Sequence, residues 1–253
     1  MDFIVPVNEM LTDKITKLNN TLIPPGFHGD VRSVRIMQET LSKLIDRLGE
    51  QSSTAQNLNR VITTAEKLRN SPDLILYILK DASAKGGKGE LIGLLKVGWK
   101  HLFLFDEQDK VRQVEPLCVL DFFVLPDYQR HGYGKVLFDH MLKDLNATPK
   151  ELAIDGPSPK MEQFLRKNYG IQRLIRQNTN FAISPDFFTA FAETSSKSGR
   201  STPVVTTSVG RFAAPKPQSV IANVIHGDSG YQETSNGFYR CRQMSRQDSL
   251  QHT

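Results

Sequence analysis

Apolar residues recur every three or four positions over residues 31–51, the spacing that gives a helix one buried face. This stripe predicts a long amphipathic helix, and its members are Met37, Leu41, Leu44, Ile45 and Leu48. A small helix is expected over residues 11–22. Thr63 and Glu66 resemble a capping box, which predicts another short helix ending near Ser71-Pro72.

Extended apolar runs predict the strands of a sheet. They cover residues 3–7, 74–80, 91–105, 111–125 and 152–155, with one or two more strands over 173–188. The polar segment 106–110 predicts a hairpin tip, and the glycine-rich segment 85–89 predicts a turn. Because helices and strands alternate up to residue 190, we expect one α/β domain over residues 1–190, with a mixed central sheet flanked by helices.

The composition changes beyond residue 190. Ser, Thr, Gln, Gly, Pro and Arg dominate residues 191–253, without apolar periodicity. Such a segment cannot bury enough apolar surface to offset the entropy lost on ordering. We therefore expect residues 191–253 to form a disordered basic tail.

The overall composition narrows the function classes. The chain has 253 residues, 39% of them hydrophobic, and a formal charge of +5, which favours an acidic partner. No apolar run approaches the roughly 20 residues that cross a bilayer, and the first residues do not resemble a secretory signal, so neither a membrane partner nor secretion is expected. Two cysteines and six scattered histidines give neither a disulfide framework nor metal-ligand spacing. We expect an intracellular protein without a metal, and no nucleic-acid partner because a recognition motif is missing.

The most informative segment follows an apolar strand that stops at Pro126. Its residues are Gln129, Arg130, His131, Gly132, Tyr133, Gly134 and Lys135, and an amphipathic helix begins there. Such a strand–loop–helix junction presents unpaired backbone N–H groups, and glycines let a ligand approach them closely. The order matches neither a Walker loop nor a dinucleotide fingerprint. A phosphate site is predicted, and an ordinary tight turn is the alternative.

The order Gln-x-x-Gly-x-Gly in this segment resembles the acetyl-CoA pyrophosphate loop of the GNAT superfamily of N-acetyltransferases. Ser158 followed by Pro159 predicts an N-cap and a proline at the first helical position. The helix predicted from there, over residues 158–170, ends in Tyr169-Gly170 and is similar to the second signature helix of that superfamily. More specific segments resemble the alpha-tubulin N-acetyltransferase family over roughly residues 1–190; they are residues 46–49, 55–58, 77–81, 92–98, 114–122, 129–132 and 152–155.

The resemblance implies a GNAT fold and direct acetyl transfer from acetyl-CoA, in a ternary complex, to a lysine of alpha-tubulin in the microtubule lumen. It also implies a cytoplasmic, microtubule-associated protein, with the cilium and the axon as candidate locations, and we expect a monomer. Two alternatives stay open. One is a GNAT enzyme acting on another protein amine or a small polyamine, and the other is a non-catalytic microtubule-binding module.

The resemblance assigns three groups of residues to acetyl-CoA. Backbone N–H groups from Gln129 to Gly134 are expected to hold the pyrophosphate, with Arg130 and Lys135 adding charge and His131 contacting an anion or solvent. A strand segment is expected to pair with the pantetheine amides, and it comprises Phe122, Phe123, Val124 and Leu125. The second signature helix is expected to bind the other side of the molecule through Ser158, Pro159, Lys160, Phe164 and Lys167.

Three residues are candidates for the chemistry. A lysine amine is almost wholly protonated near pH 7, so a base or a water chain must accept a proton. Taken alone, Cys118 is typical of a buried strand cysteine and Asp155 of a turn former. The resemblance implies that both matter in catalysis, with either as general base, and we favour Asp155 slightly because an apolar site raises a thiol pKa. Gln56 alone is typical of a solvated helix end, but it matches a critical glutamine of the family and is expected to orient the amine or a water.

Contacts with the protein substrate are expected at two places. Asp121 lies between apolar residues and is expected to order the acceptor site. The resemblance implies that the acceptor lysine lies on a flexible loop of alpha-tubulin, and Asp106 and Glu107 at the hairpin tip are expected to meet basic features around that loop. The chain has an intact glycine loop together with four candidate site residues, and this combination argues against a non-catalytic module. The four residues are Gln56, Cys118, Asp121 and Asp155.

Overall fold

The computed structural model describes residues 6–198. Most of the strand expected over residues 3–7, and residues 199–253 of the expected tail, lie outside the described residues. None of the helices in the described part is both long and apolar enough to cross a membrane.

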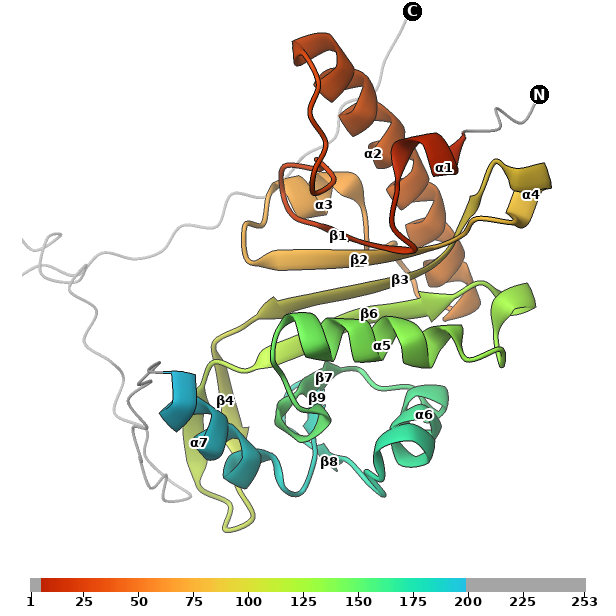
Figure 1. Ribbon diagram of the computed structural model, residues 1–253. Coiled ribbons are helices and arrows are strands. Elements are labelled where there is room, and N and C mark those ends of the chain that lie inside the picture. The colour runs from red at the N-terminus through yellow and green to blue at the C-terminus, as the bar shows by residue number, and fades with distance from the viewer. Residues whose placement is uncertain (1–5, 199–253) are drawn as a thin grey trace, which may run out of the picture. The chain divides into compact units, whose positions relative to one another are not determined.

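The centre of the domain is a seven-stranded sheet (Figure 1). Its strands, in spatial order, are β1 (Ile15–Leu18), β2 (Leu74–Asp81), β3 (Glu90–Trp99), β6 (Leu117–Val124), β7 (Ala153–Asp155), β9 (Phe181–Ile183) and β8 (Ile175–Arg176). Neighbouring strands are antiparallel except β6 and β7, which are parallel. The expected mixed α/β sheet is therefore confirmed.

Helices cover both faces of the sheet, because each carries one apolar stripe. One face packs against α1 (Val7–Met10), α2 (Val31–Ala55) and α3 (Ala65–Arg69), with Leu41, Ile45, Leu76 and Leu94 in the shared core. The other face packs against α5 (Tyr133–Asp144) and α6 (Pro159–Tyr169), with Leu137, Phe138, Met141 and Leu165 buried. These two layers hold the site between them.

A smaller two-stranded sheet carries the predicted hairpin. It consists of β4 (Leu102–Phe105) and β5 (Val111–Val114), and it shares a third core cluster with α7 (Phe187–Ser198). Short helical turns complete the domain: α4 (Ala84–Gly87), η1 (Pro126–Tyr128) and η2 (Pro149–Glu151). The turn expected over residues 85–89 lies at α4.

Several local expectations were wrong. Residues 11–22 contain β1 instead of a helix; Leu18 and Leu22, four residues apart, are both buried, which mimics a helical spacing. The cap of α3 is Thr64, whose side chain accepts from the Lys67 N–H, and not Thr63. The run 91–105 divides between β3 and β4, and α7 continues past the expected boundary at residue 190.

Candidate functional site

The strands β6 and β7 part at the centre of the sheet. Their register joins only Cys118 to Ala153 and Val119 to Ile154, whereas β6 runs on to Val124. A cavity of about 750 Å³ opens at this point. The cavity therefore lies where β6 and β7 are no longer paired.

A β-bulge in β6 decides which side chains face this cavity from each layer. Lys96 of β3 pairs with Asp121, but Val97 pairs with Val119, so Leu120 is the extra residue. Beyond the bulge, Asp121 lies on the α2 side of the sheet, where its carboxylate meets Ser52. Phe122 lies on the opposite side, against Phe138 and Phe164.

The start of α5 forms one end of the cavity. Gly132 is the N-cap with φ +84°, and no side chain caps this helix end. A Cβ on Gly134 would lie 3.2 Å from the ring of Phe122, so a larger residue there would crowd this wall of the cavity. The first N–H groups of a helix lack partners within the helix, and they suit a phosphate. Gln129, Arg130 and the two glycines all line the cavity.

The expected cofactor residues divide into two sets. Those that line the cavity are Phe122, Phe123, Val124, Gln129, Arg130, Gly132, Gly134, Lys135, Ser158, Lys160, Phe164 and Lys167. Leu125, His131, Tyr133 and Pro159 do not line it. The N–H of Leu125 donates to the Ile92 carbonyl at 2.8 Å, so it is not free to pair with a ligand amide.

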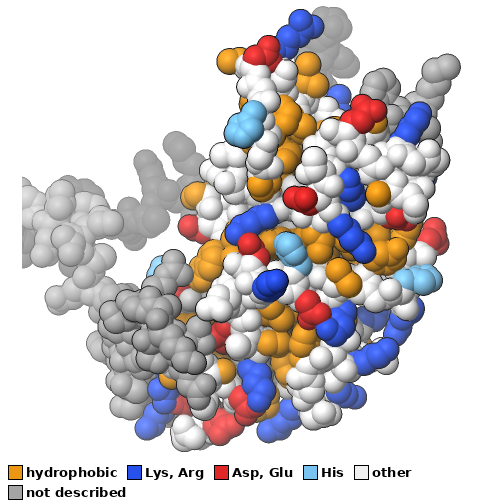
Figure 2. Space-filling view, in the orientation of Figure 1, with side chains coloured by type: hydrophobic (Ala, Val, Ile, Leu, Met, Phe, Trp, Pro, Cys, Tyr) orange, Lys and Arg blue, Asp and Glu red, His pale blue; other side chains and the backbone are white. Residues whose placement is uncertain are grey.

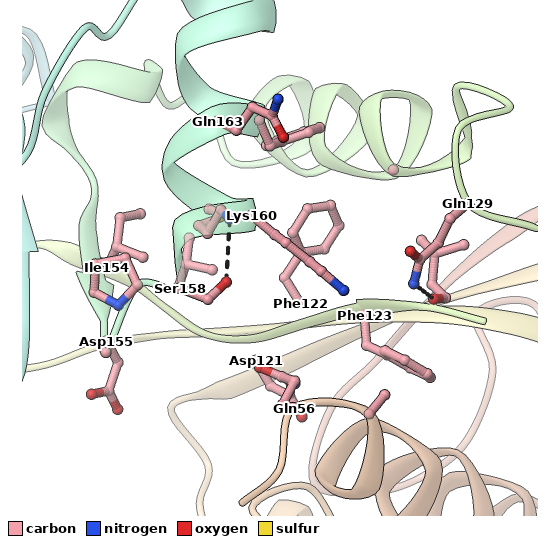
Figure 3. A pocket seen from close by; sticks show the side chains of 18 of the residues that line it. Gln56, Asp121, Phe122, Phe123, Gln129, Ile154, Asp155, Ser158, Lys160 and Gln163 are labelled. Carbon is pink, nitrogen blue, oxygen red and sulfur yellow. Dashed lines mark hydrogen bonds between the residues drawn. The ribbon is translucent and has the colours of Figure 1, made fainter. Parts of the chain in front are cut away.

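The α6 helix forms the second wall. Ser158 caps it by accepting from the Met161 N–H at 3.2 Å, and Pro159 occupies the first turn, as predicted. Figure 3 shows the Lys160 side chain extending across the cavity beside Phe122. Basic side chains are frequent over α5 and α6 in Figure 2, which suits an anionic ligand.

A buried carboxylate organises the α2 side of the cavity. Asp121 is 4% exposed. Its Oδ1 accepts from the Ser52 hydroxyl at 3.0 Å and from the Gln56 Nε2 at 2.9 Å, and its Oδ2 accepts from the Thr63 hydroxyl at 2.5 Å. Gln56 and Asp121 lie together below β6 in Figure 3. We call Ser52, Gln56, Thr63 and Asp121 the Asp121 cluster.

Buried donors also fix the segment after α2. The Ser53 hydroxyl donates to the Arg60 carbonyl at 2.9 Å, and Lys96 Nζ donates to the Ile62 carbonyl at 2.6 Å. Burial lowers the pKa of Lys96 to about 8, although Asp121 opposes this shift. Arg60 and Ile62 both line the cavity, so these bonds set the shape of its wall.

The two candidate bases have different environments. Asp155 is exposed at the end of β7, where it lines the cavity; desolvation raises the pKa of its carboxyl, and Lys100 and Lys96 oppose the rise. Cys118 is fully buried, lies outside the cavity lining, and its pKa is raised to about 12 by burial. A thiol with that pKa is almost wholly protonated near pH 7 and is a poor base there. The geometry favours Asp155.

Cys118→Ala should therefore cost stability more than chemistry. Removing the buried sulfur should lower the free energy of unfolding by about 1–2 kcal/mol. Turnover should fall much less than in Asp155→Asn, with the shape of its pH profile unchanged. Denaturant unfolding and initial rates across pH would measure both. A complete loss of turnover in a folded Cys118→Ala protein would contradict the preference for Asp155.

The acidic hairpin tip is mainly structural. Asp106 is 8% exposed and accepts from the N–H groups of Gln108 and Lys110 and from Arg112 Nε at 2.8 Å. Burial opposes its ionisation, but these hydrogen bonds lower its pKa overall. Asp106 thus closes the turn, and neither it nor Glu107 lines the cavity.

The sequence did not identify several residues of the site. They are Ser52, Ser53, Arg60, Ile62, Lys96, Met161, Gln163 and Asn180. Lys96 gave a usable signal, because a lone lysine within an apolar strand demands a buried partner. Within residues 6–198 no group of three histidine, cysteine or acidic side chains is placed to hold a metal ion.

Comparison with known proteins places this site in a family. Residues 3–210 match the family model described as GNAT acetyltransferase, Mec-17. The chain belongs to this family. Membership in the Mec-17 family confirms the expected GNAT fold and makes the protein an acetyltransferase.

Individual relatives agree with the Mec-17 assignment. The "Alpha-tubulin N-acetyltransferase" of Trichoplax adhaerens is 45% identical over 197 residues, covering 74% of this chain and 82% of that protein. "Alpha-tubulin N-acetyltransferase 1" of Danio rerio is 43% identical over 188 residues, covering 74% of this chain and 62% of that protein. The Drosophila melanogaster protein of the same name is 40% identical, and the match covers 41% of its length.

Among solved structures, Arabidopsis thaliana NAA60 in complex with acetyl-CoA is 17% identical, covering 53% of this chain and 81% of that chain, with a TM-score of 0.38.

Proposed function

We propose that this acetyltransferase moves the acetyl group of acetyl-CoA directly onto a lysine side chain of alpha-tubulin, in a ternary complex formed in the microtubule lumen. The observation that carries the proposal is the continuous cavity. It connects an uncapped helix N-terminus at Gly132 with Asp155 and the Asp121 cluster. Two relatives named alpha-tubulin N-acetyltransferase, 45% and 43% identical, support the choice of acceptor.

The residues of the cavity fit acetyl-CoA. Backbone N–H groups around Gly132 and Gly134, with Arg130, suit the pyrophosphate, and Lys160 and Lys167 suit further phosphate. Phe122 and Phe164 supply apolar surface for the pantetheine arm. The thioester would then lie where β6 and β7 part, close to Asp155.

The reaction needs an amine nucleophile and an acceptor for its proton. The neutral lysine nitrogen attacks the thioester carbonyl, a C–N bond forms, and the C–S bond breaks to release CoA as its thiol. The ammonium must first lose a proton, and Asp155, directly or through water, is the group placed to take it. Holding both substrates in one cavity supplies much of the acceleration.

The proposed location follows from the proposed substrate. An enzyme that acts on microtubules works at the cytoskeleton, including that of cilia or axons, and a monomer is the proposed acting form.

The test is acetylation of assembled microtubules. Purified protein should transfer label from acetyl-CoA to one alpha-tubulin lysine, mapped by mass spectrometry, and should act more slowly on histone peptides and polyamines. Faster acetylation of those other amines would overturn the proposed acceptor. Co-sedimentation with microtubules without any transfer would instead indicate a binding module. Comparing microtubules with unassembled tubulin tests the lumenal setting.

A further inference from the structure

The Gln56 amide has a defined orientation. Its Nε2 donates to Ser52 Oγ at 2.7 Å and to Asp121 Oδ1 at 2.9 Å. A carboxylate only accepts hydrogen bonds, so the amide nitrogen, and not the amide oxygen, must face Asp121. Both N–H donors are then used. The carbonyl oxygen Oε1 is the polar atom that Gln56 has left for the cavity it lines.

The other members of the Asp121 cluster enforce this direction. The single proton of the Ser52 hydroxyl is donated to Asp121 Oδ1, so its oxygen is left to accept from Gln56. The Thr63 hydroxyl donates to Asp121 Oδ2. Every hydrogen bond of the cluster therefore runs toward one carboxylate, which is buried and acts only as an acceptor.

A carbonyl oxygen facing the cavity recognises an N–H donor. We infer that Asp121, with Ser52 and Thr63, fixes Gln56 so that its Oε1 accepts a hydrogen bond from the acceptor lysine amine and aligns it for attack. The inference rests on the proposed function, because it assigns the acceptor half of that site. Asp121, Ser52 and Thr63 are positioning residues that act through Gln56. A hydroxyl acceptor, which would form an ester, gains less from this arrangement. An amine keeps an N–H donor for Gln56 while its lone pair attacks, whereas a hydroxyl has only one proton and gives it up in the reaction.

Reversing the direction of the hydrogen bonds provides a sharp test. Asp121→Asn replaces one carboxylate oxygen with an NH2 group that only donates, so the cluster loses one of the two acceptor atoms that hold its donors. The Gln56 amide is then held less firmly in its present orientation and can present its own nitrogen to the acceptor lysine. The value of kcat/KM for microtubules should fall roughly 10- to 100-fold, the usual effect of an unpaired buried hydrogen-bonding group. Affinity for CoA, measured by calorimetry, should stay within about twofold, because the Asp121 cluster does not include the phosphate site.

A second substitution should restore the original direction of the hydrogen bonds. In the double variant Gln56→Glu with Asp121→Asn, the glutamate would accept from the asparagine amide and still present an oxygen to the cavity. Its kcat/KM should exceed that of Asp121→Asn and that of Gln56→Glu by at least about fivefold each. A merely structural role for Asp121 predicts that the double variant recovers thermal stability without recovering kcat/KM.

Paired threonine variants supply the control. Thr63→Val removes one donor to Asp121, whereas Thr54→Val removes a hydroxyl that bonds only to the Glu50 carbonyl on the exposed side of α2. The first should lower kcat/KM several-fold and the second should leave it unchanged.

Two results would overturn the inference while leaving the proposed function intact. One is an Asp121→Asn enzyme with wild-type kcat/KM, and the other is a double variant no better than either single variant. Inactivity of the wild-type protein toward every alpha-tubulin lysine would overturn the proposed function itself, and this inference with it.

Discussion

Asp155→Asn is expected to lower turnover by roughly 10²- to 10⁴-fold, the contribution typical of a positioned general base. Asparagine keeps the size of the side chain but cannot accept the proton of the lysine ammonium. Affinity for CoA should change little, because the phosphate site is formed by α5 and α6 and Asp155 ends β7. Steady-state rates with microtubules and calorimetry with CoA would separate the two quantities.

The pH dependence of turnover tests the same prediction, because the direction in which turnover should change with pH is known. Desolvation at the cavity wall raises the pKa of Asp155, and Lys100 and Lys96 oppose this rise. Only the ionised carboxylate accepts a proton, so wild-type turnover should fall as the pH drops through this raised pKa. That acid limb should disappear in Asp155→Asn. Asp186→Asn is the matched control, because Asp186 is an exposed aspartate paired only with Lys150 at the surface. If Asp155→Asn had the same turnover as the wild-type protein at every pH, Asp155 would be rejected as the base.

The sequence predicted the parts of the fold that depend on local periodicity. The stripe beginning at Met37 identified α2, and the Ser158-Pro159 pair identified the start of α6, because caps and buried faces are encoded within a few residues. The same logic misread residues 11–22, because a short strand can carry buried residues at helical spacing. It also misread Thr63, whose hydroxyl serves Asp121 instead of a helix end.

The hydrogen bonds that join Gln56 to Asp121 in the acceptor half of the site could not be predicted in this way. Asp121 receives its hydrogen bonds from residues 58 to 69 positions away along the chain. No local pattern encodes those distances. The bulge at Leu120, which turns Asp121 toward α2, is likewise invisible in an apolar run. The glycine loop was therefore predictable from the sequence, because its residues act locally, whereas the connections of the Asp121 cluster required the folded chain.

Gly134→Trp should abolish cofactor binding while preserving the fold. A Cβ at this position would lie 3.2 Å from Phe122 and 3.8 Å from Phe164, so an indole must enter the cavity that the phosphates and pantetheine need. Gly134 lies in the first turn of α5 and its φ is not positive, so the backbone accepts a side chain. We expect CoA affinity to fall at least about 100-fold, equivalent to roughly 2.7 kcal/mol, and turnover to fall with it.

Substitutions of increasing size at position 134 test whether the loss of CoA affinity depends on the space that the new side chain occupies. Gly134→Ala adds only the Cβ, which ordinary movement of the Phe122 ring can accommodate, so its CoA affinity should fall only a few-fold. Val136→Trp is the matched control, because Val136 is 45% exposed on the same helix and its replacement would project into solvent. Calorimetry should then rank CoA affinity as wild type and Val136→Trp together, Gly134→Ala below them, and Gly134→Trp lowest, with thermal unfolding showing that all four proteins are folded. Normal CoA binding by Gly134→Trp would show that the ligand does not lie against the start of α5, because an indole and a pyrophosphate cannot share that space.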